Sequence, residues 1–244
     1  MSAFGYCADV DCYYGREEIE VIEEILPDTV MTFDTFTDPP GVVLFPEEAE
    51  LVRRAADKRR TEFTTARHCV HRAMERLGVP PVPVLSGAHG EPAWPPGVVG
   101  SITHCAGYRA AAVSAGPGTI GIDAEPDGPL PPGVLEAISV AQEREPLRRL
   151  AAEHPGTSWD RILFSAKESV YKAWYPLARR WLDFQDAVIV LDPLHGTFDA
   201  RLLVAGPRWH GQPVSGFAGR WMARRGLVLT AIAVTAPPAG RKAA

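Results

Sequence analysis

The chain has no paired cysteine motif and no long apolar segment. None of its four cysteines, Cys7, Cys12, Cys69 and Cys105, forms a Cys-x-x-Cys pair, which argues against a zinc site or a disulfide scaffold and favours free thiols. No apolar run approaches the ~20 residues of a membrane span, and the first residues show no basic-then-apolar export signal. We therefore expect a cytoplasmic protein with no membrane partner.

Positive charge is also in short supply. The formal net charge is −5 at pH 7, whereas general nucleic-acid binding needs a broad basic surface. We therefore expect no nucleic-acid partner. The 244 residues are 46% hydrophobic and 23% charged, which is ordinary for a globular protein of one large domain or two packed subdomains.

Lysine is scarce and unevenly placed. Only four of the 25 basic residues are lysines, and two of them, Lys167 and Lys172, fall within six residues. Lysine is a compact ammonium that can release a proton, whereas arginine stays charged. The clustering favours a functional role for this pair, with chance placement on a helix as the alternative.

Acidic residues gather beside these lysines in two short segments. Asp123 and Glu125 lie two apart in an expected strand, so they project from the same face. Glu168 and Lys172 lie one turn apart in an expected helix and also share a face. Three carboxylates beside lysines suit a hard cation and a pyrophosphate. An oxygen-only ligand set predicts Mg²⁺ or Mn²⁺; solvated residues on an edge strand are the alternative.

Periodicity predicts helices and short strands in both halves of the chain. We expect a helix near Glu17–Leu26, one that begins at Pro46 and a second that ends near Leu77. Helical segments follow around 133–153, and a long helix runs from Ser158 to Pro176. The expected strands are Val30–Phe36, Val98–His104, Tyr108–Ser114, Thr119–Glu125, Ala187–Leu191, Thr197–Val204, Phe217–Met222 and Leu227–Val234, the last two forming a hairpin.

The clearest break in the chain is the glycine-rich segment 115–118. It predicts an N-terminal subdomain over residues 1–117 and a C-terminal subdomain over residues 118–244. Each half is expected to hold helices and a small antiparallel sheet, an α+β architecture. The long second-half helix has its apolar stripe at Ile162, Ala166, Val170, Ala173 and Leu177, which leaves Glu168 and Lys172 to face a cleft.

Other motifs leave alternatives open. Ser169 and Lys172 have the Ser-x-x-Lys spacing of serine acyl-enzymes, but the partner motifs of those enzymes are missing. The two histidines of the segment His68-Cys69-Val70-His71 have helical metal-ligand spacing, but there is no third ligand. His104 ends its strand, where a lone histidine is usually structural.

Taken together, three blocks resemble one enzyme family, the 4′-phosphopantetheinyl transferases of the larger Sfp/EntD type. They are Gly100-Ser-Ile-Thr-His104, Gly121-Ile-Asp-Ala-Glu125 and the helix from Lys167-Glu-Ser to Lys172-Ala-Trp-Tyr175. The blocks follow the family's order and spacing, and the resemblance covers roughly residues 55–190.

The resemblance implies a pseudo-twofold α+β fold that binds coenzyme A in the cleft between two similar halves. It implies Mg²⁺-dependent transfer of phosphopantetheine to a serine of an acyl or peptidyl carrier protein of fatty-acid, polyketide, nonribosomal peptide or siderophore synthesis, with release of adenosine 3′,5′-bisphosphate. It also implies a monomer that is itself a pseudo-dimer.

The resemblance also implies roles for single residues. Asp123, Glu125 and Glu168 would bind Mg²⁺; Glu168, Lys167 and Lys172 would be catalytic; and Arg59, Arg67, His89, Thr103, His104 and Lys172 would contact coenzyme A. Many members carry a basic residue in or just before the Gly-x-Pro block, where this chain has His89 and Glu91. We expect His89 to replace that contact in a pH-dependent way.

Two other functions fit part of the pattern. A different Mg²⁺-dependent phosphotransferase or a pyrophosphatase would use the same carboxylates with another nucleophile or with water. A carrier-binding module with a dead site is the non-enzymatic alternative, and the intact Asp123, Glu125, Glu168 and lysines argue against it.

Overall fold

The computed structural model describes residues 20–235. The start of the helix expected from Glu17 lies outside these residues, as do Cys7 and Cys12. The described part of that segment forms the short 3₁₀ helix η1.

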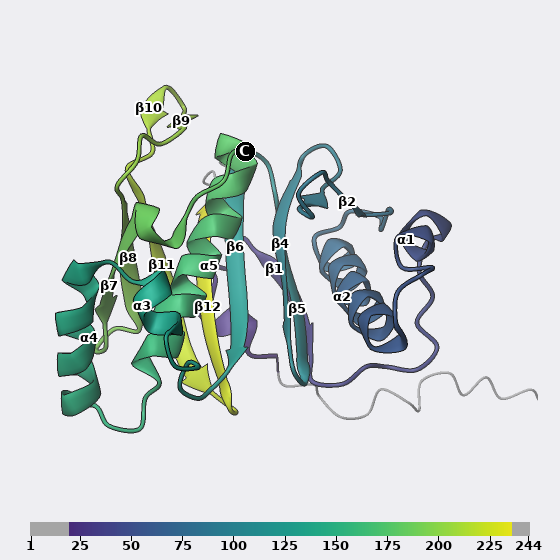
Figure 1. The fold of residues 1–244 in the computed structure, drawn as a ribbon. Helices are drawn as coiled ribbons and strands as arrows, with labels where there is room; N and C mark the ends of the chain where they lie inside the picture. The colour runs from purple at the N-terminus through teal and green to yellow at the C-terminus, as the bar shows by residue number, and fades with distance from the viewer. Residues whose placement is uncertain (1–19, 236–244) are drawn as a thin grey trace, which may run out of the picture.

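The chain folds into two antiparallel sheets with helices against them (Figure 1). The first half comprises η1 (Ile22–Ile25), β1 (Met31–Thr35), α1 (Pro46–Leu51), α2 (Asp57–Arg76), β2 (Leu85–Ser86), β3 (Pro92–Ala93), β4 (Val98–Cys105) and β5 (Tyr108–Ala115). The second half comprises β6 (Gly118–Pro126), α3 (Val134–Ile138), α4 (Ala141–Glu153), α5 (Trp159–Ala178), η2 (Phe184–Asp186), β7 (Ala187–Asp192), β8 (Thr197–Leu202), β9 (Arg208–Trp209), β10 (Gln212–Pro213), β11 (Gly216–Arg224) and β12 (Leu227–Thr235).

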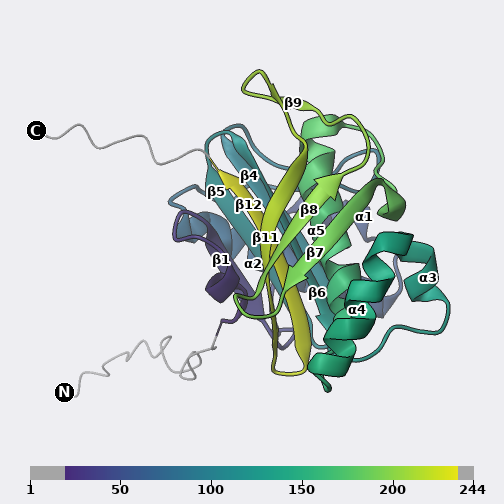
Figure 2. The same cartoon turned by 90° about the vertical axis from the view of Figure 1, so that its left-hand side faces the viewer.

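The expected α+β class is confirmed, and the two sheets differ in size. The first has the strand order β1-β5-β4, and α2 packs against β1 and β5. The second has the order β6-β12-β11-β8-β7, and α5 packs against β6 and β12 (Figures 1 and 2). The strands β5 and β6 lie in different sheets, and we propose that the two subdomains divide at Pro117 between them.

The two halves share a core and a polar seam. Apolar side chains of β5, β6 and β12 pack into one buried cluster. Beside it, Ser101 accepts a hydrogen bond from the backbone N–H of Ile122 (3.1 Å), and Thr103 accepts one from that of Ala124 (3.0 Å). These hydroxyls on β4 satisfy backbone groups on the edge of β6, which would otherwise be buried and unpaired. Alternate residues of β4 therefore fasten the first half to the second.

Turn chemistry explains the last hairpin. Strands β11 and β12 are joined by Arg225 and Gly226, both with positive φ (55° and 74°). Two consecutive residues of positive φ make the tight turn that matches the twist of a two-stranded ribbon. The hairpin predicted from the sequence is confirmed.

The prediction that Pro176 ends the long helix is wrong by two residues. Helix α5 continues to Ala178 and stops at Arg179, which adopts a left-handed conformation and donates its backbone N–H to the Tyr175 carbonyl (2.9 Å). A proline costs a helix one N–H and a clash with the preceding turn. In the last turn of α5 this cost of Pro176 does not end the helix, and the left-handed conformation of Arg179 ends it instead.

Helix α5 lies unusually close to strand β6 at Gly121. A Cβ at this position would lie 2.0 Å from the Ser169 carbonyl oxygen and 2.8 Å from the Ala173 backbone nitrogen. No side chain fits in that space, so the glycine of the Gly-Ile-Asp block permits direct contact of helix and strand backbones. This contact sets the distance between α5 and β6.

Substituting Gly121 tests this packing. We expect Gly121→Ala to lower the free energy of unfolding by about 1–3 kcal/mol, because the methyl group must push backbone away from backbone. Urea unfolding gives the value. Gly128→Ala, where a Cβ would meet nothing within 4 Å, is the control and should change stability by less than about 0.5 kcal/mol. Equal effects of both substitutions would refute close packing at Gly121.

Candidate active site

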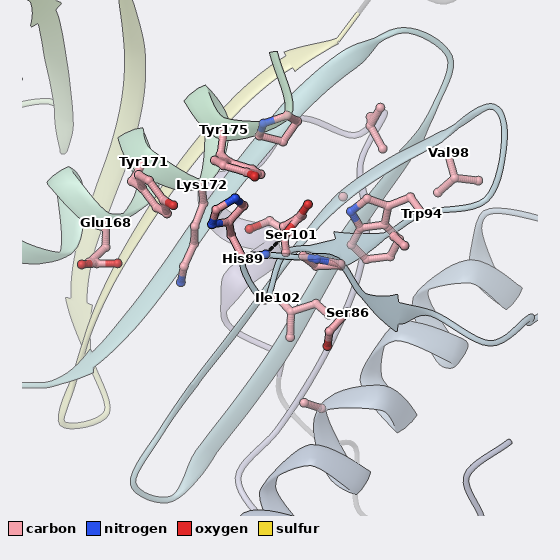
Figure 3. Close-up of a pocket in the computed structure, with 18 of the residues that line it drawn as sticks. Ser86, His89, Trp94, Val98, Ser101, Ile102, Glu168, Tyr171, Lys172 and Tyr175 are labelled. Atoms are coloured by element: carbon pink, nitrogen blue, oxygen red, sulfur yellow. Dashed lines mark hydrogen bonds between the residues drawn. The ribbon is translucent and has the colours of Figure 1, made fainter. Parts of the chain in front are cut away.

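A pocket of about 780 Å³ separates the two halves (Figure 3). One wall comes from α2, the β2–β3 hairpin and β4, and the facing wall comes from α5, which contributes Glu168, Tyr171, Lys172 and Tyr175. Such a volume lies within the range of roughly 300–1,000 Å³ that is common for small-molecule sites. The sequence predicted that Glu168 and Lys172 face a cleft, and this placement is confirmed.

Most of the residues predicted to contact coenzyme A line this pocket. They are Arg59, Arg67, His89, His104 and Lys172. Thr103 is elsewhere: it is buried in the seam, where its hydroxyl accepts from the Ala124 N–H and donates to Asp123 Oδ1 (3.4 Å). The structure therefore places Thr103 where it orients β6 and Asp123, with its hydroxyl outside the pocket lining.

Arg67 is a buried cation at the pocket wall. Its guanidinium lies over the Phe63 ring (4.4 Å to the centroid), and its Nε is 3.8 Å from the carboxylate of the fully buried Glu48. Nε is buried and makes no hydrogen bond. Burial lowers the pKa of Arg67 to about 10, with Glu48 opposing the shift and Arg59 adding to it. An anion that enters the pocket would therefore stabilise Arg67 by accepting a charge-assisted hydrogen bond from its guanidinium.

His104 lies at the exposed end of β4. Partial desolvation lowers its pKa, and the positive charge of Arg59 lowers it further, while Glu62 opposes the shift. The imidazole is therefore less readily protonated than a free histidine until an anion binds beside it. Arg59 and Arg67 bring two positive charges to this side of the pocket, where Glu62 brings one negative charge.

The three predicted metal ligands lie around α5 and β6, each in a different setting. Asp123 Oδ1 accepts a hydrogen bond from Lys172 Nζ at 2.7 Å, and Lys172 also donates to the Ile122 carbonyl (2.9 Å). Glu125 pairs with Arg161 at 3.0 Å. Burial and the Asp123 charge raise the pKa values of both Glu125 and Glu168. The three carboxylates therefore repel one another, as ligands of one cation do in its absence.

The residues fit a hard cation in chemistry and charge. Asp123 Oδ2 is buried and makes no hydrogen bond, although a buried carboxylate oxygen normally has a partner. Among residues 20–235, no three His, Cys, Asp or Glu side chains converge closely enough to hold a metal ion. Binding would thus require side chains of Glu125 or Glu168 to rotate toward Asp123. The metal assignment of Asp123, Glu125 and Glu168 stays a prediction.

Lys167 lies away from this pocket. Its ammonium donates to the carbonyls of Phe184 (2.7 Å) and Ala187 (2.9 Å) and pairs with Glu143 at 2.9 Å, and both charged side chains are 1% exposed. The clustering of Lys167 and Lys172 in the sequence predicted a functional role for both lysines. The structure places only Lys172 beside Asp123, whereas Lys167 ties α5 to the start of β7.

Two alternatives from the sequence are inconsistent with the structure. Ser169 is fully buried and hydrogen-bonded to Thr230 (2.6 Å between the hydroxyl oxygens), so it is no exposed nucleophile of a Ser-x-x-Lys enzyme. His71 is paired with Glu48 at 3.1 Å, and the His68–His71 segment forms no metal-binding group in the described part of the chain.

Several residues at the site were not predicted. Arg161, Tyr171 and Tyr175 lie on the same face of α5 as Glu168, at spacings of seven, three and seven residues. Helical periodicity could have found them. Trp209 also lines the pocket from a distant hairpin, and no sequence pattern signals it. No helix within residues 20–235 has the length and apolar character to cross a membrane.

Comparison with known families covers both halves of the chain. Residues 47–114 match the 4′-phosphopantetheinyl transferase N-terminal domain, and residues 119–222 match the 4′-phosphopantetheinyl transferase superfamily. The chain belongs to the 4′-phosphopantetheinyl transferase superfamily. It is a transferase of the kind that the sequence blocks indicated, and the family acts on carrier proteins.

Individual relatives agree over most of the chain. The transferase Svp of Streptomyces mobaraensis is 55% identical over 89% of this chain and 90% of its own length. PptT of Mycobacterium tuberculosis is 49% identical over 87% of this chain and 97% of its own length, and Npt of Nocardia iowensis is 46% identical over 87% and 99%. Proteins named enterobactin synthase component D match over a shorter region. The predicted Sfp/EntD-type family is confirmed.

The raised pKa of Glu168 has a consequence for stability. The folded state binds the Glu168 proton more tightly than the unfolded state, so the stability contribution of this group is fully present below the unfolded pKa of 4.5 and is lost as pH rises from there through the raised folded pKa. Glu168→Gln imitates the protonated form. We expect it to raise the free energy of unfolding at pH 7.5 and to lose that advantage near pH 4, where both proteins are uncharged at this position. A variant no more stable than wild type at pH 7.5 would refute the raised pKa.

Proposed function

We propose that the chain transfers 4′-phosphopantetheine from coenzyme A to a serine of an apo acyl or peptidyl carrier protein. Adenosine 3′,5′-bisphosphate is the other product. The observation that carries the proposal is the pocket, which joins Arg59, Arg67, His104 and Lys172 to the carboxylate Glu168 in one cleft. Phosphates of coenzyme A need several cations, and the serine needs a base.

The cations divide between two groups of phosphates in this proposal. Arg59, Arg67 and His104 bind the 3′-phosphate of the ribose and its surroundings, and Lys172 binds the pyrophosphate. When coenzyme A binds, the Lys172 ammonium exchanges part of its contact with Asp123 for phosphate oxygens. His89 stands at the pocket wall beside the Tyr175 ring (5.7 Å between centroids) and replaces the family's basic contact there.

Glu168 is the proposed general base. Its pKa is raised by burial and by the charge of Asp123, which makes it a better proton acceptor than an exposed glutamate. It takes the proton of the carrier serine while the serine oxygen attacks the β-phosphorus. Lys172 stabilises the negative charge that develops on the departing bisphosphate.

Asp123, Glu125 and Glu168 would hold Mg²⁺ in this proposal, or Mn²⁺ in its place. The metal supplies Lewis-acid stabilisation of pyrophosphate charge. Binding it would satisfy the unpartnered Asp123 Oδ2 and relieve repulsion among the three carboxylates. Lys167 has no part in this scheme and acts as a structural residue through Glu143. One chain supplies every wall of the pocket, so we propose that the monomer is active.

The test is transfer to a carrier protein, followed by mass spectrometry of the carrier. Incubation with coenzyme A, Mg²⁺ and an apo carrier should add one phosphopantetheine, and removal of Mg²⁺ with EDTA should stop the reaction. Asp123→Asn and Glu168→Gln should each reduce turnover roughly a hundredfold or more, the usual cost of losing a general base or a metal ligand. Asp127→Asn, an exposed acid at the end of the same strand, is the control and should retain turnover.

The outcomes separate the alternatives. Release of adenosine 3′,5′-bisphosphate without carrier would identify a pyrophosphatase that uses water. Near wild-type turnover of Glu168→Gln at saturating Mg²⁺ would contradict its role as base. Full activity in EDTA would contradict the metal assignment.

A further inference from the structure

A short hairpin stands beyond the C-terminal end of α5. Its strands are β9 and β10, and it projects from the five-stranded sheet in two perpendicular views (Figures 1 and 2). One of its residues, Trp209, is partly buried and lines the large pocket. The hairpin thus brings one indole back toward a site that is built mainly from α2, β2–β4 and α5.

The hairpin is locally well fixed. His210 and Gly211 form its turn with φ values of 48° and 79°, and Arg208 Nη1 donates to the Gly211 carbonyl at 2.7 Å. At its base, the Val214 N–H donates to the Pro207 carbonyl at 2.9 Å. The Trp209 ring lies edge-on to His210, with 4.6 Å between centroids. An indole ordered before binding loses little conformational entropy when a ligand arrives.

The pocket is polar on one side and aromatic at one end. Figure 3 shows Glu168 and Tyr171 toward one end of the pocket, Trp94 and Val98 toward the other, and Tyr175 with His89 between them. Tyr175 is two helical turns from Glu168, about 10 Å along α5. Beside it, Arg179 reaches Glu91 of the β2–β3 hairpin at 3.8 Å. The hairpin is tied to this end of α5, because Arg180 donates to the Ala205 carbonyl at the base of the hairpin, and Trp209 lines the same pocket as Tyr175, Pro176 and Arg179.

We infer that Trp209 contacts the adenine base of coenzyme A and fixes the nucleotide end of the substrate. This inference rests on the proposed function. In the proposed function the phosphates lie near Arg59, Arg67 and Lys172 and the reacting phosphorus lies beside Glu168, so we place the purine at the opposite, aromatic end. A purine is the only aromatic part of coenzyme A, and an indole provides a large flat surface for it. Trp209 is therefore a positioning residue, contributed by a hairpin that takes no part in the chemistry.

The experiment compares a ligand with the base and a ligand without it. Adenosine 3′,5′-bisphosphate and inorganic pyrophosphate are titrated into wild type and into Trp209→Ala, Trp209→Phe and Leu203→Ala by calorimetry. Leu203 is an exposed apolar residue near the base of the same hairpin, outside the pocket lining, and serves as the matched control. Circular dichroism of each variant checks that the fold is retained.

We expect Trp209→Ala to weaken adenosine 3′,5′-bisphosphate roughly five- to thirtyfold, in line with base–aromatic stacking elsewhere. Pyrophosphate binding should stay unchanged. Trp209→Phe should restore most of the loss, and Leu203→Ala should behave as wild type. Unchanged bisphosphate binding in Trp209→Ala, or an equal loss for pyrophosphate, overturns the inference alone. Wild-type protein that binds neither coenzyme A nor the bisphosphate overturns the proposed function, and the inference with it.

Discussion

The arrangement of the site depends on the contact between α5 and β6 at Gly121. Because this residue has no side chain, the Ser169 carbonyl oxygen can lie only 2.0 Å from the position that a Cβ of residue 121 would occupy. One turn of α5 beyond Glu168 then brings the Lys172 ammonium within 2.7 Å of Asp123 and 2.9 Å of the Ile122 carbonyl. The two acidic segments of the sequence are thus parts of one structural unit. Gly121 sets the distance between α5 and β6, and that distance allows Lys172 to contact Asp123.

Helix α5 separates its chemistry from its packing. One face presents Glu168 and Lys172 to the pocket, while another buries Lys167 against Glu143. Burial lowers the pKa of Lys167, and the hydrogen bond and charge of Glu143 oppose that shift. Glu143 is held in turn by the backbone N–H groups of Val140 (2.8 Å) and Ile189 (2.7 Å). Removing one partner would leave an uncompensated buried charge, so this pair locks α4, α5 and β7 together.

Elements with a clear period were predictable from the sequence, and elements shaped by distant partners were not. The strands around Asp123 and His104 were expected within a residue or two, because alternation and flanking glycines mark them. The role of Lys167 was not predictable, because the pattern of one helix does not show that its partner Glu143 lies on another helix packed against it. The role of Thr103 was not predictable for the same reason, because its hydroxyl accepts a hydrogen bond from a backbone N–H of β6, a strand of the other half. Two-residue strands such as β9 have no period at all, so Trp209 gave no signal.

The most direct test of this account replaces each lysine of α5 by arginine. Lys172→Arg should lower the turnover of carrier modification at least roughly tenfold with unchanged stability, because a compact ammonium contacts the leaving group and a forked guanidinium does not replace it. Lys167→Arg should do the opposite, lowering the free energy of unfolding by about 1–3 kcal/mol through overpacking while turnover per folded molecule stays intact. Equal turnover losses in both variants, or none in Lys172→Arg, would contradict the division of labour along this helix.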